Sequence, residues 1–149
     1  MKKTLSFLLI LMILLSCLSA LPALADEAKL QTPEIIGFES TKDGINITWS
    51  PVQNAEKYRI YYKGRNGWTR MATTADTSYF DADVSLGTTY TYTVRCINVD
   101  ESAFTSDYNT TGWKHTHYLA TPEITGFEGS AQGVNIRWNA VDGAAKYRV

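Results

Sequence analysis

The chain has 149 residues, of which 44% are hydrophobic and 12% aromatic. Outside Lys2 and Lys3, the other 12 of its 14 basic residues stand against 15 acidic residues, and neither charge forms a run. This distribution excludes the basic patch that nucleic-acid-binding proteins carry, so we expect no nucleic-acid partner. The frequent Tyr and Thr residues, and the lack of helical Leu periodicity after residue 25, predict an all-β protein.

Residues 1–25 are predicted to be a secretory signal peptide. Met1-Lys2-Lys3 precedes an apolar run from Leu5 to Leu15, and Ala23-Leu24-Ala25 places small residues at the first and third positions before Asp26. Signal peptidase cleaves after this pattern, so we expect cleavage after Ala25 and a secreted or cell-surface protein. The apolar run is shorter than the ~20 residues that a membrane span needs, so we expect no span in the mature chain.

The leader also permits a second interpretation. Leu14-Leu15-Ser16-Cys17 resembles a bacterial lipoprotein box, in which Cys17 would become a lipidated N-terminus. The eight residues that follow Cys17 stay largely apolar, which favours the cleaved signal peptide. Residues 26–31 then form a short polar lead-in to the first folded unit.

A long internal repeat organises the rest of the chain. The stretch Leu30 to Ile60 returns 89 positions later as Leu119 to Val149, and 17 of the 31 aligned positions are identical. A period of this size corresponds to a whole small domain. The sequence therefore predicts one complete module over residues 32–120 and an incomplete second copy over residues 121–149.

Strand periodicity is legible in the first half of the module. Ile45, Ile47 and Trp49 alternate with polar residues, which predicts a strand with one buried face. The stretch 57–63 alternates likewise, with Tyr58, Ile60 and Tyr62 on one side and Arg59 and Tyr61 on the other. Asn66-Gly67 is predicted to turn the chain into a returning strand over residues 68–73.

The second half continues the same pattern. A short strand is predicted over residues 77–81, and the longest strand follows Gly87, with Tyr90, Tyr92, Val94 and Cys96 facing one way. A final strand over residues 104–118 is expected to be broken by a bulge at Gly112. With residues 33–39 these segments make seven strands, and short strands separated by frequent turns predict an immunoglobulin-like β-sandwich.

Three features, taken in order, resemble the fibronectin type III domain. They are Trp49 on the second strand, the Tyr58 to Tyr62 pattern on the third, and the run from Val84 to Tyr90. The resemblance implies a seven-stranded sandwich of the kind found in tandem repeats of secreted bacterial surface proteins. It also implies that Tyr90 bonds through its hydroxyl to backbone a few residues upstream, although Leu86 and Val84 depart from the family's usual proline and leucine. The predicted structural core is Trp49, Tyr58, Ile60, Tyr90 and Val94.

The residues that could take part in catalysis or bind a metal do not form a convergent site. Cys96 is the only cysteine of the mature chain, so we expect it to pack in the core. His115 and His117 project from the same face of a strand and offer two metal ligands without a third, so we expect an exposed terminal strand there. Asp81, Asp83, Asp100 and Glu101 lie in or beside turns, where such residues bond locally. We expect no catalytic residue, cofactor or metal.

A surface of aromatic residues is the remaining candidate. Tyr61 faces outward, and with Trp68 and Trp113, whose facing the sequence leaves open, it could form a platform for stacking sugars. We therefore expect a non-enzymatic extracellular spacer or interaction module of a larger secreted or cell-surface bacterial protein, with an unidentified protein or glycan as partner. The alternative is the N-terminal accessory region of a secreted hydrolase, a carbohydrate-binding region among the options, with its catalytic domain beyond Val149.

Overall fold

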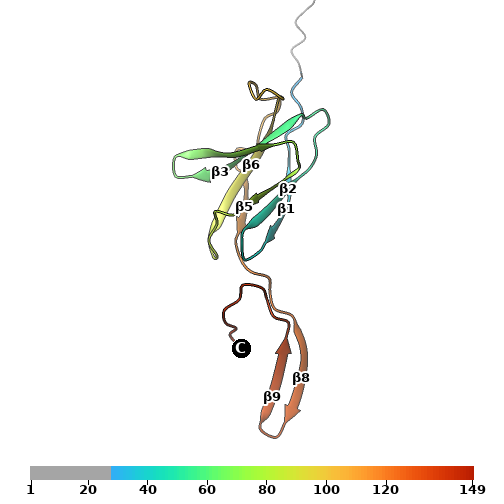
Figure 1. Ribbon diagram of the computed structural model, residues 1–149, viewed down its shortest axis with the longest axis vertical. Coiled ribbons are helices and arrows are strands. Elements are labelled where there is room, and N and C mark those ends of the chain that lie inside the picture. The colour runs from blue at the N-terminus through green and yellow to red at the C-terminus, as the bar shows by residue number, and fades with distance from the viewer. Residues whose placement is uncertain (1–27) are drawn as a thin grey trace, which may run out of the picture.

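The computed structural model describes residues 28–149, so the predicted signal peptide and lipoprotein box lie outside the described residues. The described part is built from β-strands alone (Figure 1). No helix in it has the length and apolar character that crossing a membrane requires. The strands are β1 (Ile35–Ser40), β2 (Ile45–Trp49), β3 (Lys57–Gly64), β4 (Gly67–Thr74), β5 (Ser78–Asp81), β6 (Thr89–Ile97), β7 (Trp113–Thr116), β8 (Ile124–Ser130) and β9 (Gly133–Trp138).

The first seven strands form two antiparallel sheets. One has the order β1-β2-β5 and the other the order β4-β3-β6-β7. Two antiparallel sheets that bury one common core constitute a β-sandwich. The chain crosses from one sheet to the other between β2 and β3, between β4 and β5, and between β5 and β6, which gives an immunoglobulin-like topology. The predicted all-β class and seven-stranded sandwich are therefore confirmed.

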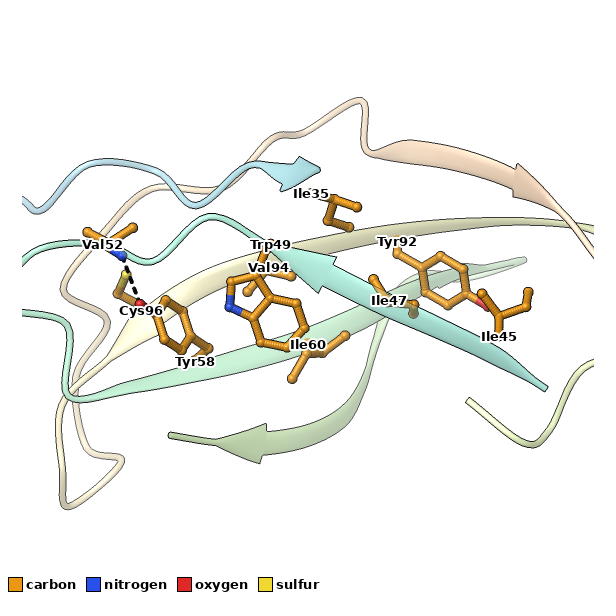
Figure 2. Close-up of a cluster of buried hydrophobic side chains, with 10 residues drawn as sticks. All are labelled: Ile35, Ile45, Ile47, Trp49, Val52, Tyr58, Ile60, Tyr92, Val94 and Cys96. Atoms are coloured by element: carbon orange, nitrogen blue, oxygen red, sulfur yellow. Dashed lines mark hydrogen bonds between the residues drawn. The ribbon is translucent and has the colours of Figure 1, made fainter. Parts of the chain in front are cut away.

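The core lies between the sheets and follows the period-two alternation of the strands (Figure 2). From β2, Ile45, Ile47 and Trp49 point inward with exposed fractions of 0%, 0% and 1%. Full burial of each such side chain stabilises the fold by about 1.5–3 kcal/mol. Of the residues predicted for the core, Trp49, Tyr58, Ile60 and Val94 lie in this cluster and Tyr90 packs against it.

The hairpin between β3 and β4 differs in detail from the prediction. Gly64 pairs with Gly67, so the turn is centred on Arg65 and Asn66, one position earlier than Asn66-Gly67. Gly67 carries the positive φ of 109° as the first residue of the returning strand. A turn followed by a glycine in the positive-φ region is a common hairpin closure, which explains why Gly67 begins the strand.

The predicted final strand over residues 104–118 is wrong in extent, because only Trp113–Thr116 forms β7. Ile97 bridges Phe104, whereas Tyr92 pairs with Trp113, so the returning chain carries four more residues than β6 between these two contacts. The extra residues are accommodated over 107–112, where the chain leaves the edge of the sheet and forms a bulge. Gly112 has a φ of 75°, which supports the predicted break there and lets the chain return to the sheet.

The second unit is a single hairpin, β8–β9, that repeats the geometry of β1–β2. Ile35 pairs with Trp49, and its counterpart Ile124 pairs with Trp138; each ladder then shifts register before the next pair. The same bulge therefore occurs at the same place in both copies. The repeat in sequence is thus a repeat in backbone structure, and Figure 1 shows this hairpin beyond one end of the sandwich.

Candidate functional site

The outer face of the four-stranded sheet gathers cationic and aromatic side chains. β3 turns Tyr58 and Ile60 into the core, so the alternating residues Arg59, Tyr61 and Lys63 lie on the opposite face. On the neighbouring β6, Arg95 lies on the same outer face, because the cross-strand pair Arg59 and Arg95 shares one side of the sheet.

The bulge over residues 107–112 covers part of this face. Thr93 Oγ1 donates a hydrogen bond to the backbone oxygen of Asn109 at 3.0 Å, and Asn109 Oδ1 accepts from the backbone N–H of Thr111 and of Gly112, both at 3.0 Å. These bonds fold the bulge across the sheet. The Tyr108 ring consequently meets the Trp68 ring edge to face, with centroids 6.3 Å apart.

A shallow cavity of about 120 Å³ lies between the bulge and the sheet. The Arg95 guanidinium carbon lies 3.6 Å from the ring centroid of Phe104 and 5.2 Å from that of Tyr108, and Lys63 Nζ lies 5.5 Å from the Trp68 centroid. Cations over aromatic faces hold both partners in place. The cavity is lined by Tyr61, Trp68, Thr93, Arg95, Phe104 and Tyr108.

Beside the cavity, one carboxylate holds three cations. Glu101 Oε2 accepts from Arg59 at 2.5 Å and from Arg70 at 3.1 Å, and Lys57 Nζ lies 3.5 Å from Oε1. The hydrogen bond from Arg59, followed by one from Thr73, lowers the pKa of the Glu101 carboxyl below its ordinary value of 4.5. Three cations therefore converge on this one carboxylate.

The structure brings together only part of the predicted stacking platform. Tyr61 and Trp68 line the same cavity, whereas Trp113 lies on β7 opposite Tyr92 and packs against the core. Phe104 and Tyr108 complete the cavity and were not predicted as part of it; Phe104 bridges Ile97 ahead of the bulge, and Tyr108 lies within the bulge.

The two histidines have structural partners. His115 Nε2 lies 2.8 Å from Ser40 Oγ, and His117 Nε2 donates to the backbone oxygen of Thr41 at 2.8 Å. His117 is 1% exposed, so the expectation of an exposed terminal strand is wrong at this position. Burial, and then the proximity of His117, lower the pKa of His115. Within residues 28–149, no three His, Cys, Asp or Glu residues are grouped closely enough to hold a metal ion.

Cys96 is buried and is the only free cysteine of the described residues. Its backbone N–H donates to Ser106 Oγ at 2.8 Å, and burial raises the pKa of its thiol. A buried, protonated thiol is a poor nucleophile, so Cys96 serves the packing of the core.

Comparisons with known proteins give partial similarities. No known family profile matches the chain. A stretch of 59 residues is 34% identical to the poly(3-hydroxybutyrate) depolymerase of Ralstonia pickettii; it covers 40% of this chain and 11% of that enzyme. The matched chain thus spans about a tenth of the length of this curated relative.

Two solved structures are also similar. The crystal structure of FN3tt is 25% identical, with a TM-score of 0.42, over 58% of this chain and 95% of that one. The structure of an FN3tt mutant is 27% identical, with a TM-score of 0.40, over 54% of this chain and 98% of that one. On its own strand order and sequence motifs, the seven-stranded unit is a fibronectin type III-like sandwich.

Proposed function

We propose that this chain is a non-enzymatic extracellular module that spaces or docks other domains of a larger secreted protein. The observation that carries the proposal is the repeat, because the β1–β2 hairpin and its register recur after 89 positions as β8–β9. The joint Tyr118-Leu119-Ala120 contains neither Gly nor Ser. Short joints of this composition restrict the angle between neighbouring domains, which suits a spacer.

The partial similarity to a poly(3-hydroxybutyrate) depolymerase favours a second candidate. In this alternative, the module is an accessory region of a secreted hydrolase and holds an insoluble polymer near a catalytic domain elsewhere in the protein. The cavity that includes Tyr61 and Trp68 would then serve as the polymer-contacting surface, since partly exposed aromatic rings with fixed neighbours bind apolar or sugar surfaces at low entropic cost.

A binding assay distinguishes the two candidates. Residues 26–149 are incubated with particles of poly(3-hydroxybutyrate), cellulose and chitin and tested on a glycan array. The spacer predicts no retention on any polymer. The accessory region predicts retention that falls at least about tenfold in Trp68→Ala, since aromatic anchors of this kind contribute more than 1 kcal/mol.

The matched control is Phe80→Ala. Phe80 is 46% exposed on β5 of the opposite sheet, so its loss removes a comparable ring without touching the cavity. Retention that falls equally in both variants would indicate nonspecific adsorption and would contradict the accessory role. Micromolar binding that Trp68→Ala alone abolishes would contradict the spacer.

A further inference from the structure

The two sheets of the sandwich are unequal in width, and the difference opens a cleft. The smaller sheet ends at β5, whereas the larger sheet continues past β3 to β4. The inner face of β4 therefore lacks an opposing strand. A cleft of about 390 Å³ lies there, within the range of small-molecule sites, and is separate from the aromatic cavity on the outer face.

Three tyrosines form most of its wall. Tyr62 points from the inner side of β3, Tyr79 comes from β5, and Tyr90 comes from β6, with Met71 of β4 beside them. The Tyr90 ring is held in place, because its hydroxyl accepts the backbone N–H of Ser85 at 2.8 Å and its ring stacks on Tyr92 at 6.2 Å. The wall is thus aromatic and partly rigid before any ligand arrives.

Two carboxylates complete the lining, Asp81 and Asp83. Asp81 is 6% exposed; its oxygens accept from Tyr92 Oη at 2.8 Å and from the backbone N–H of Asp83 at 3.1 Å. Neither aspartate forms an ion pair with a described residue. Both groups that donate to Asp81 are neutral, so a cationic ligand in the cleft would give it an ionic partner that no described residue supplies.

The one basic residue that lines the cleft does not neutralise Asp81 and Asp83. Arg70 borders the cavity, but its guanidinium donates to Glu101 at 3.1 Å and to Thr73 at 3.2 Å on the outer side of the sheet. The negative field of the cleft is visible at Tyr79, where burial, followed by the charges of Asp81 and Asp83, raises the pKa of the phenol. An anionic ligand is therefore disfavoured.

We propose that this cleft binds an alkylammonium group. The tyrosine faces would surround the methyl or methylene groups by cation–π attraction, and Asp81 with Asp83 would supply the counter-charge. Aromatic cages with nearby carboxylates suit quaternary ammonium in particular, because that cation is weakly hydrated and lies well against ring faces. The inference stands apart from the proposed function, since it concerns a different face of the sandwich.

The experiment is a titration of residues 26–149, observed by NMR, with choline and with its neutral isostere 3,3-dimethyl-1-butanol. Choline should shift the resonances of Tyr62, Tyr79 and Asp83, and the isostere should bind at least about tenfold more weakly, because it lacks only the charge. n-Butylammonium tests whether a primary ammonium is also accepted. Equal binding of choline and the isostere, or no shift at 50-fold molar excess of either cation, would overturn the proposal.

Matched variants assign the site. Asp83→Asn removes one exposed charge, and Tyr62→Ala removes one ring; each should weaken choline binding about fivefold or more. Tyr61→Ala is the control, because Tyr61 adjoins Tyr62 on β3 but faces the other side of the sheet. The amide spectrum of each variant reports folding. Binding that is unchanged in both site variants, or lost equally in Tyr61→Ala, would contradict a ligand in this cleft.

Discussion

Two tyrosine hydroxyls tie the connecting loops to the core of the first unit. Tyr58 Oη accepts the backbone N–H of Val52 at 2.9 Å, and Tyr90 Oη accepts that of Ser85 at 2.8 Å. The Tyr58 bond recurs in the second unit, where Tyr147 accepts from Val141 at 2.7 Å. Each bond satisfies a backbone donor that the turn leaves without a strand partner. The bond of Tyr90 was expected from the family resemblance, whereas that of Tyr58 depends on a loop conformation that strand periodicity does not reveal.

The first prediction compares the loss of a large core side chain with the loss of a single hydrogen bond. Trp49→Ala should lower the unfolding free energy by about 3–5 kcal/mol, because loss of the indole leaves a cavity in the core beside Tyr58 and Ile60. Tyr90→Phe should cost about 1 kcal/mol, because it removes one hydrogen bond and keeps the ring. Urea unfolding of residues 26–120 measures both. An unmoved midpoint in Trp49→Ala would contradict the position of the tryptophan in the core.

The charge of Glu101 yields a second prediction, on pH. Its pKa is lower in the folded chain than its ordinary value of 4.5, so the folded state favours the carboxylate. The stability from this group is therefore fully present above about pH 4.5 and is lost as pH falls through the depressed value. Below pH 4.5, thermal unfolding temperatures should fall more steeply in the wild type than in Glu101→Gln. Parallel pH profiles would contradict the ion cluster with Arg59 and Arg70.

At the scale of elements, the strands were largely predictable and the bulge was not. Alternation specifies which face of β2, β3 and β6 is buried, because one sheet face meets the core and the other meets water. The bulge over residues 107–112 obeys no such rule. Its course depends on Asn109 bonding to Thr93 and to its own turn, and it carries Tyr108, which lines the aromatic cavity. The sequence therefore supplied Tyr61 and Trp68 but missed Phe104 and Tyr108.

Gly112 allows the third prediction. A Cβ at this position would lie 2.6 Å from Trp68 and 2.7 Å from Thr91, and the residue has a φ of 75°. Gly112→Ala should therefore cost about 2–4 kcal/mol, through both backbone strain and collision. The control is Gly87→Ala, where φ is 77° but the added Cβ meets nothing within 4 Å, so strain alone should cost about 1–2 kcal/mol. Equal costs in urea unfolding would mean that the bulge does not press on Trp68.

At the scale of the molecule, the two copies have the same residues in different surroundings. Ile35 is 6% exposed inside the sandwich, whereas its counterpart Ile124 is 58% exposed. The residues around Trp138 form an open apolar cavity of about 460 Å³, where the first copy has its second sheet. The repeat made the hairpin predictable from the first copy, because register and bulge depend on contacts within the two strands. The burial of side chains in the second copy could not be inferred from the first copy, because burial depends on the opposing sheet.

Hydrogen exchange of residues 26–149 tests this difference within one chain. The backbone N–H of Trp49 donates to Thr77, just before β5. Its counterpart Trp138 lies on β9, which has only β8 as a neighbour. The backbone N–H of Trp138 should therefore exchange far faster than that of Trp49. Ser50 and Asn139 provide the matched control, because each donates at 2.9 Å to the residue just before the first strand of its own copy, Glu34 before β1 and Glu123 before β8. Asn139 should therefore exchange more slowly than Trp138, while Ser50 and Trp49 are both protected. Protection of Trp138 equal to that of Trp49 in a monomer would mean that a further strand pairs with β9, and the hairpin would no longer be the open half of a sandwich.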